Sequence, residues 1–214
     1  MIVIAIDGPA ASGKSSVSRR LAKHLGFSYV NSGSLYRAVT WEVLRQGVDT
    51  TCAEAIAGAL ANARFACTVS DAGESVVSIN GAIAEAALRD PAINSHVSRV
   101  AAVPAVRALV TNALRALAAD RSLVMEGRDI GSAVFPETPH KFYLDASPEI
   151  RNRRRAAEGL ADQIEARDRM DSTRKTAPLT VAPGARVVET SHLTLDGVVA
   201  AILGLLKAAG IQEK

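Results

Sequence analysis

The first 26 residues of the chain constrain its fold more than any other segment. Residues 2–6 (IVIAI) form a continuous apolar run, typical of a strand covered on both faces of a parallel sheet. Residues 8–15 (GPAASGKS) then match the pattern G-x-x-x-x-G-K-[ST] at every fixed position. Apolar residues recur at helical spacing up to Leu25, and Gly26 is a helix stop. The segment therefore predicts a strand, a phosphate-binding loop (P-loop) and a helix in direct succession.

Further short strand candidates recur along the chain, separated by stretches with helical patterns. They are residues 28–31, 123–126, 141–144 and 186–189. Strands that alternate with helices predict an α/β protein whose helices cover both faces of a central, mainly parallel sheet. Together with the loop, this pattern predicts a three-layer P-loop NTPase fold.

Two regions interrupt the alternation. Residues 65–80 alternate apolar and polar side chains around the turn sequence DAGE (71–74), which predicts a small inserted hairpin. Residues 149–175 are basic and helical in propensity, and Pro178 is expected to end that helical region. We therefore expect two small appendages beside the core.

The charge balance argues against a nucleic-acid polymer as a partner. The 25 Lys and Arg residues against 22 Asp and Glu give a net charge of only +3. Hydrophobic residues make up 48% and charged residues 22%, as in soluble globular proteins. The basic residues are concentrated in one stretch, which is either a solvated helix face or a cluster that meets several phosphates. They are Arg151, Arg153, Arg154, Arg155, Arg167, Arg169, Arg174 and Lys175.

Membrane insertion and secretion are not expected. The apolar run at residues 2–6 ends at Asp7 without a basic segment before it, unlike a secretion signal. The longest apolar run near the C-terminus, residues 198–206, is about half of the roughly 20 residues that a spanning helix needs. Cys52 and Cys67 form no C-x-x-C motif and are expected in the core or in loops. We therefore expect a reduced, cytoplasmic protein that acts as a monomer.

The P-loop indicates a nucleoside triphosphate and Mg²⁺ as ligands. Its backbone N–H groups and the following helix N-terminus suit the β-phosphate. Lys14 would bridge β- and γ-phosphate oxygens, and the Ser15 hydroxyl would ligate Mg²⁺. The residues expected to bind ATP in this loop are Gly8, Pro9, Ala10, Ala11, Ser12, Gly13, Lys14, Ser15 and Ser16.

A P-loop alone does not identify a reaction. GTPases are disfavoured because the chain contains neither D-x-x-G nor N-K-x-D. A motor would normally be larger or carry a partner-binding surface. A small-molecule kinase fits best, and a nucleotide-binding regulatory module without turnover is the alternative from another class.

Two further motifs follow predicted strands. Residues 31–37 (NSGSLYR) and 126–129 (EGRD) each place an arginine, Arg37 and Arg128, at a strand end. Ligands bind at this edge of such sheets. Because a forked guanidinium suits a phosphate, the pair suggests that the acceptor is itself a phosphate monoester.

With these motifs, essentially the whole chain resembles the cytidylate kinase family of nucleoside monophosphate kinases. Four blocks carry the resemblance: GPAASGKSS (8–16), SGSLYR (32–37), GRDIGSAVFP (127–136) and RDRMDSTRKTAPL (167–179). Adenylate kinases share the first two blocks but not the third or the hairpin insert. The resemblance implies transfer of the γ-phosphoryl group of ATP to CMP or dCMP. A different small phosphate acceptor is the second hypothesis.

The resemblance also implies how the acceptor phosphate is held. Arg37 and Arg128 would bind the phosphate of CMP, with help from Ser32 and Tyr36. Without the resemblance, Tyr36 would be interpreted as a core residue.

The base and the ribose have their own implied ligands. Ser98, Arg107 and Asp129 would recognise the cytosine edge, because its exocyclic amine lies beside acceptors at N3 and O2. Asp171 would accept from the ribose hydroxyls. The alternatives are that Ser98 faces solvent and that Asp171 and Arg174 form a surface ion pair at i, i+3.

Arginines of the basic stretch match the family's mobile lid. Cations that close over the transferred group are the expected catalysts, because phosphoryl transfer spreads charge over its oxygens. Arg155 is assigned to ATP, Arg174 also to the acceptor, and no general base stands out. The residues expected to be catalytic are Lys14, Arg128, Arg154, Arg167 and Arg174.

The resemblance implies one domain over residues 1–214, divided into three regions. The core comprises about residues 1–31, 104–150 and 180–214, the monophosphate-binding region about residues 32–103, and the lid about residues 151–179.

Three features depart from the family pattern. Asn31 and Glu126 stand where relatives often have Asp, so metal affinity is expected to differ. The segment between Arg155 and Arg167 is short.

Overall fold

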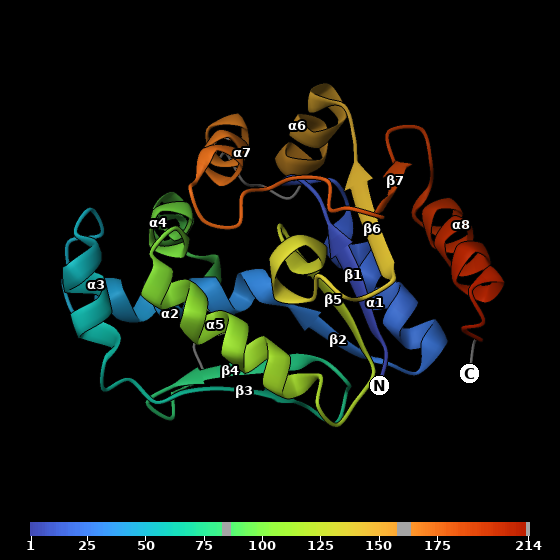
Figure 1. The fold of residues 1–214 in the computed structure, drawn as a ribbon. Helices are drawn as coiled ribbons and strands as arrows, with labels where there is room; N and C mark the ends of the chain where they lie inside the picture. Colours follow the sequence, from blue (N-terminus) through green and yellow to red (C-terminus); the bar gives the residue numbers. More distant parts are fainter. Residues whose placement is uncertain (83–86, 158–163, 213–214) are drawn as a thin grey trace.

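The computed structural model describes residues 1–82, 87–157 and 164–212 (Figure 1). The elements, in chain order, are β1 (Val3–Asp7), α1 (Lys14–Leu25), β2 (Ser28–Asn31), α2 (Ser32–Arg45), α3 (Ala53–Leu60), β3 (Phe65–Val69), β4 (Ser75–Ile79), α4 (Pro91–Ala101), α5 (Pro104–Leu117), β5 (Leu123–Gly127), β6 (His140–Asp145), α6 (Pro148–Ala157), α7 (Ile164–Thr173), β7 (Arg186–Glu189) and α8 (Leu195–Ala208). A 3₁₀ turn (Ala87–Arg89) precedes α4, and a π-helical turn (Ile130–Val134) follows β5.

The central sheet is parallel throughout its described part, with strand order β2-β5-β1-β6-β7. β1 is the middle strand, and its Ile4 is in register with Val124 of β5 and His140 of β6. The carboxyl ends of β1, β2 and β5 therefore meet at one edge of the sheet, where the P-loop leaves β1. The predicted parallel α/β architecture is confirmed.

Helices cover both faces of this sheet, which gives the predicted three layers. On one face α1 and α8 pack together, and Leu21 and Ile202 belong to the same buried cluster. On the other face α2 and α5 contribute Val39 and Val110 to a second cluster. Figure 1 shows α8 beside α1 at one side of the sheet and α5 at the other.

The predicted hairpin insert is present. β3 and β4 pair antiparallel, and they pack against α5 and α2. Val77 and Ile79 of β4 are buried in the same cluster as α2 and α5. The turn between the strands also reaches the main sheet, because the Tyr29 N–H donates to the Gly73 carbonyl at 2.8 Å.

The described parts of the basic stretch are helical, as expected, and form α6 and α7. Figure 1 shows α6 and α7 above the ends of β1 and β6. α7 ends at Thr173, before the expected stop at Pro178, and the chain turns at Ala177, whose φ is +48°. Part of the short segment between Arg155 and Arg167 lies outside the described residues.

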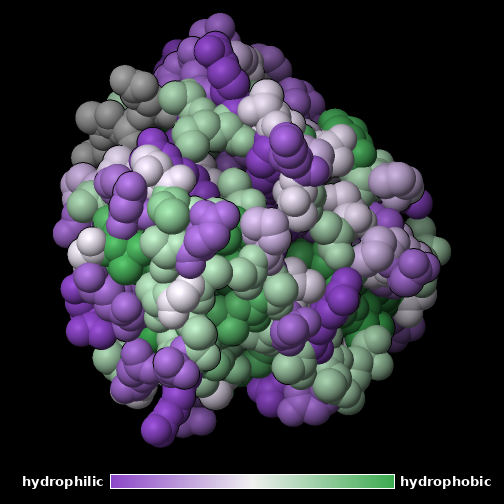
Figure 2. All heavy atoms as spheres, turned by 60° about the vertical axis from the view of Figure 1, so that its left-hand side comes forward, coloured by the Kyte–Doolittle hydropathy of each residue, from purple (hydrophilic) through white to green (hydrophobic). Residues whose placement is uncertain are grey.

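In the view of Figure 2, the surface has no large patch that is only hydrophobic or only hydrophilic. Hydrophilic side chains gather at the top and around the rim, and the centre contains both kinds. In the described part of the chain, no single helix has the length and hydrophobicity needed to cross a membrane. α4 and α5 reach that length and composition only as a pair, with a 97° bend between them.

The P-loop leaves β1 through a backbone conformation that only glycine adopts readily. Gly8 has φ +148°, and a Cβ atom there would lie 2.1 Å from the Leu144 carbonyl oxygen of β6. Gly13 has φ +92° and precedes α1. The loop can lie this close to β6 only because position 8 has no side chain.

We predict that Gly8→Ala destabilises the folded protein by about 3 kcal/mol or more, because the backbone of two adjacent strands would have to move. Gly204→Ala is the matched control, because Gly204 lies exposed in α8 with open space where a Cβ atom would stand. It should stabilise the protein by about 0.5–1 kcal/mol. Urea denaturation measures both, and equal stabilities of the two variants would contradict the prediction.

Candidate functional site

A cleft of about 230 Å³ opens at the carboxyl ends of β1, β2 and β5. The P-loop, the start of α2, α4, the loop after β5 and the two helices α6 and α7 enclose it. Its lining residues are Ala10, Ala11, Gly13, Lys14, Ser15, Ser16, Asn31, Ser32, Gly33, Tyr36, Arg37, Val97, Ser98, Ala101, Glu126, Gly127, Arg128, Asp129, Arg155, Arg167, Asp171 and Arg174. Most of the predicted site residues therefore share one cleft.

Lys14 begins α1 directly behind the loop. Its Nζ donates to the Pro9 carbonyl at 2.5 Å and to Ser12 Oγ at 3.3 Å. Burial, followed by repulsion from Arg128, lowers the pKa of Lys14 to about 7. The ammonium group therefore lacks sufficient negative charge around it, which is the environment expected of a group that binds an anion.

Arg37 of α2 is in a similar environment. Its guanidinium forms no hydrogen bond or ion pair within the described part of the chain. Burial lowers its pKa to about 10, and repulsion from Arg167, Arg128 and Arg155 contributes further. These cations come from α2, α6, α7 and the loop after β5, and they converge where a multiply charged anion would compensate them.

The two motifs at the strand ends pack against each other. Ser32 Oγ donates to the Glu126 carbonyl at 2.7 Å, and the Asn31 side chain accepts from Ser34 N–H at 3.2 Å as the N-cap of α2. A Cβ atom on Gly127 would lie 2.6 Å from Ser32 Oγ. Glycine at this position therefore permits the close approach of α2 to β5.

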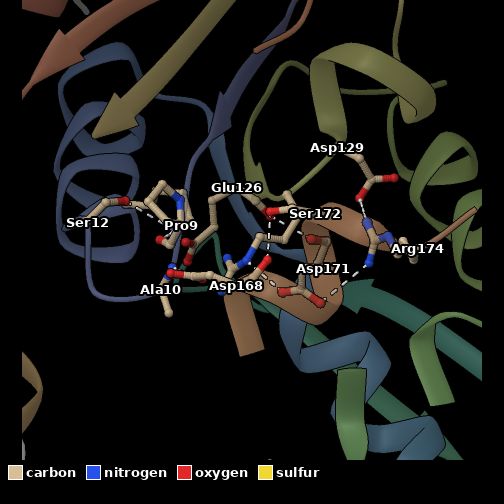
Figure 3. Close-up of polar contacts among 12 residues, drawn as sticks. Pro9, Ala10, Ser12, Glu126, Asp129, Asp168, Asp171, Ser172 and Arg174 are labelled. Atoms are coloured by element: carbon tan, nitrogen blue, oxygen red, sulfur yellow. Dashed lines mark hydrogen bonds and ion pairs between the residues drawn. The ribbon is translucent and has the colours of Figure 1, made fainter. Parts of the chain in front are cut away.

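Asp129 lies between two arginines. Arg107 Nη2 of α5 pairs with its Oδ2. Arg174 Nη2 donates to its Oδ1 at 3.2 Å, as Figure 3 shows. Burial raises the pKa of Asp129, although both arginines act against that effect. The carboxylate thus keeps a fixed orientation at the cleft wall.

Asp171 continues this network. It accepts from Arg128 Nε at 3.2 Å and lies 3.8 Å from Arg174 Nη1. The side chains of Asp171 and Arg174 are only 8% and 6% exposed, so the surface ion pair considered from the sequence is wrong.

Ser98 and Tyr36 also line the cleft. Each is 8% exposed, and the Tyr36 hydroxyl is buried without a hydrogen-bond partner in the described part of the chain. Burial raises the pKa of Tyr36 to about 12, and the Arg107 guanidinium carbon lies 5.6 Å from its ring centroid. Ser98 therefore does not face solvent, and Tyr36 both belongs to the buried core cluster and lines the cleft.

Five predicted residues do not line the cleft. Arg154 donates to the Thr190 hydroxyl at 3.0 Å and to its carbonyl at 2.8 Å, beside the P-loop. Arg107 reaches the site through Asp129. The other three are Gly8, Pro9 and Ser12, which shape the loop from behind.

The residues around Ser15 suit a magnesium ion only in combination with phosphate oxygens. Among the described residues, no group of three or more His, Cys, Asp or Glu side chains could hold a metal. Ser15 and Glu126 both line the cleft, and the Tyr29 hydroxyl donates to Glu126 Oε1 at 2.5 Å. A hydroxyl and a carboxylate are oxygen donors of the kind that Mg²⁺ takes, together with phosphates and water.

Asp7 was not among the predicted site residues, yet it holds the loop that carries Asp129. Its carboxylate accepts from the N–H groups of Ile130 at 2.8 Å and Gly131 at 2.7 Å. Burial raises its pKa to about 6 despite those hydrogen bonds. Asp7 could have been identified from the sequence, because it directly follows the first predicted strand and ligands bind near the carboxyl ends of such strands.

The comparisons with known proteins agree with this geometry. Residues 4–208 match the family model for cytidylate kinase. A cytidylate kinase from Rhodococcus opacus is 41% identical over 214 residues, which cover 94% of this chain and 93% of that protein. One from Nocardia farcinica is 43% identical over 210 residues, covering 92% of this chain and 90% of the relative.

A bifunctional pantoate ligase/cytidylate kinase from a Synechococcus species is 41% identical over 217 residues. The match covers 96% of this chain but 44% of that relative, so the chain spans less than half of its length. Among solved structures, an uncharacterized protein from Eubacterium ventriosum shares the fold, with a TM-score of 0.51 at 13% identity over 97% of this chain and 99% of that one. By the family model and by these relatives, the chain belongs to the cytidylate kinase family.

Proposed function

We propose that the protein transfers the γ-phosphoryl group of ATP to CMP or dCMP, giving ADP and CDP or dCDP. The observation that carries the proposal is the convergence of Lys14, Arg37 and Arg128 on one cleft whose far wall holds the fixed carboxylate of Asp129. The cations suit the phosphates of two substrates, and the carboxylate suits the amine of cytosine.

The donor side is assigned to the P-loop. ATP phosphates would accept from the backbone N–H groups at the start of α1 and from Lys14. Mg²⁺, when bound through Ser15 and the phosphates, would neutralise charge on the transferred group. Arg155 and Arg167 line the same cleft and would add positive charge around the transferred phosphoryl group.

The acceptor side is assigned to the region between α2, α4 and the loop after β5. Arg37 and Arg128 would bind the phosphate of CMP, with the Tyr36 hydroxyl as a further donor. Asp129 would accept from the exocyclic amine of cytosine, and Ser98 would donate to the base. Asp171, held by Arg128, would accept from the ribose hydroxyls.

Catalysis then consists of alignment and charge neutralisation. The acceptor phosphate is already ionised, so no general base is needed, and the arginines stabilise charge that spreads over the transferred oxygens. We further propose that residues 151–179 act as a lid over the core and that residues 32–103 form the acceptor region. The cleft volume is slightly below the range of about 300–1,000 Å³ of usual ligand sites, so two nucleotides would require this lid to open.

We also propose that the enzyme acts as a cytoplasmic monomer on small molecules. The net charge of +3 supports the absence of a nucleic-acid polymer among its substrates.

An ADP-release assay with CMP, dCMP, UMP, AMP and GMP tests the proposed reaction. We expect turnover with CMP and dCMP to exceed that with UMP, because the carboxylate of Asp129 would accept from the exocyclic amine of cytosine and repel the O4 acceptor of uracil. Equal rates with all five acceptors would contradict the assignment of the base site. The absence of turnover with any of them would favour a binding module.

Asp129→Asn should reduce the preference for CMP over UMP by roughly 10- to 100-fold in kcat/KM. The carboxylate repels the O4 acceptor of uracil, whereas an amide can donate to it. Glu137→Gln is the matched control, because Glu137 lies exposed after the same loop and does not line the cleft. An unchanged CMP/UMP ratio in Asp129→Asn would remove Asp129 from base recognition.

Nucleotide binding at pH 8 should be accompanied by uptake of roughly 0.9 proton per site. In the nucleotide-free protein the pKa of Lys14 is about 7, so the amine is mostly neutral at pH 8, and phosphates would return it to the charged form. Calorimetry of ATP binding in buffers of different ionisation enthalpy measures this uptake. Lys14→Met should abolish it, and equal uptake by both proteins would assign the proton to another group.

The same shift makes stability depend on pH. The pKa of Lys14 is about 7 in the folded state and lies at the ordinary value of 10.5 when unfolded. The unfolded chain therefore binds more protons between these pH values, and the contribution of Lys14 to stability rises with pH across that window. Denaturation midpoints measured at pH 7 and pH 9 test this contribution. Between these pH values the midpoint of Lys14→Met should rise less, or fall more, than that of the wild type.

A further inference from the structure

Ala10 of the P-loop has both of its backbone polar groups bound by side chains from α6 and α7. Its N–H donates to Asp168 Oδ1 of α7 at 2.9 Å, and its carbonyl accepts from Arg151 Nη1 of α6 at 3.1 Å. The same Nη1 also donates to Asp168 Oδ2, which closes the ring of contacts. Figure 3 shows the Asp168 carboxylate beside Ala10 and Pro9.

We propose that Arg151 and Asp168 form a clamp on Ala10 that positions the cleft-facing arginines Arg155 and Arg167 over the transferred phosphoryl group. Neither clamp residue lines the cleft, so both act as positioning residues. The inference rests on the proposed function, because it assigns the clamp to the same reaction.

The spacing along each helix supports this role. Arg155 follows Arg151 by four residues, so the two share one face of α6. Arg167 is the immediate neighbour of Asp168 on α7. Since both helices are bound to one residue of the loop that holds the phosphates, the clamp sets how far Arg155 and Arg167 lie from those phosphates.

The electrostatics require the two clamp residues to act together. A lone carboxylate at Ala10 would repel the phosphates of ATP, and a lone guanidinium would compete for them. The paired side chains are only 11% and 14% exposed and carry no net charge together. The clamp thus holds the helices without weakening the positive field of Lys14 and the cleft arginines.

The opposite interpretation is that Asp168 occupies an N–H group that the phosphates need. In that case removal of the carboxylate would strengthen ATP binding. A purely structural ion pair would instead lower stability, with no loss of turnover in the folded protein.

The kinetic test uses Arg151→Met, Asp168→Ala and the double variant, with Arg153→Met as the control. Arg153 lies exposed two residues along the same helix. We expect each single variant to lower kcat roughly 10- to 100-fold. The lone carboxylate left in Arg151→Met should also raise the KM for ATP, whereas the double variant removes both charges and should change that KM by less than about threefold. The double variant should be no slower than the slower single variant, because the two residues act as a unit.

Three kinetic results would overturn the clamp. The first is that kcat of both single variants stays within about threefold of that of Arg153→Met. The second is tighter ATP binding by Asp168→Ala with kcat unchanged, which would identify Asp168 as a competitor of phosphate. The third is a loss of kcat that disappears at temperatures where thermal melts show every variant to be fully folded.

Hydrogen exchange tests the clamp independently of the substrate. In the nucleotide-free protein, Asp168→Ala and Arg151→Met should speed exchange of the Ala10 amide and of α6 and α7, whereas Arg153→Met should not. Equally fast exchange of Ala10 in wild type and Asp168→Ala would show that the clamp does not form. A wild-type enzyme inactive on CMP and dCMP would refute the proposed function but leave this exchange result interpretable.

Discussion

The accumulation of positive charge at one edge of the sheet is the constraint to which the rest of the structure responds. Parallel strands bring the P-loop, the start of α2 and the loop after β5 to the same place, and each delivers a cation. Burial lowers the pKa values of Lys14 and Arg37 to about 7 and about 10, which indicates that the described residues do not fully compensate these two cations. Burial of these cations lowers the folding stability of the protein, and binding of an anion would restore it.

Buried aspartates divide the cations into two groups. Asp129 and Asp171 bind Arg107, Arg128 and Arg174 at the acceptor wall, so these arginines are oriented before any substrate arrives. A pre-oriented guanidinium does not have to reorganise as charge develops on the transferred group. Lys14 and Arg37 have no such carboxylate partner among the described residues, and their charge is left for phosphate.

The sequence predicted the parts of this arrangement that depend on local pattern. The strand and helix periods located the layers, and the fixed positions of the P-loop located Lys14 and Ser15. The hairpin insert followed from the alternation on either side of residues 71–74. These features are encoded within short windows, so no tertiary information was needed.

Contacts between distant segments could not be predicted in the same way. Arg151 and Asp168 meet Ala10 across separations of 141 and 158 residues. Arg151 belongs to the basic stretch and Asp168 to the block 167–179, but neither pattern indicates a contact with Ala10. Arg154 was assigned to the site by resemblance, and in this structure it hydrogen bonds to Thr190 and to the Ala11 carbonyl of the P-loop. Its rotamer depends on packing that the sequence alone does not reveal.

α7 and the residue that follows it join the donor side of the cleft to the acceptor side. Asp168 contacts the P-loop, Asp171 contacts Arg128, and Arg174 contacts Asp129. These positions are three residues apart, so they follow one face of the helix and the turn beyond it. A rigid helix with contacts at both ends cannot move away from one substrate without disturbing the other. In the proposed reaction, the same helix would therefore couple the position of the donor phosphates to that of the acceptor nucleotide, which is the alignment that phosphoryl transfer requires.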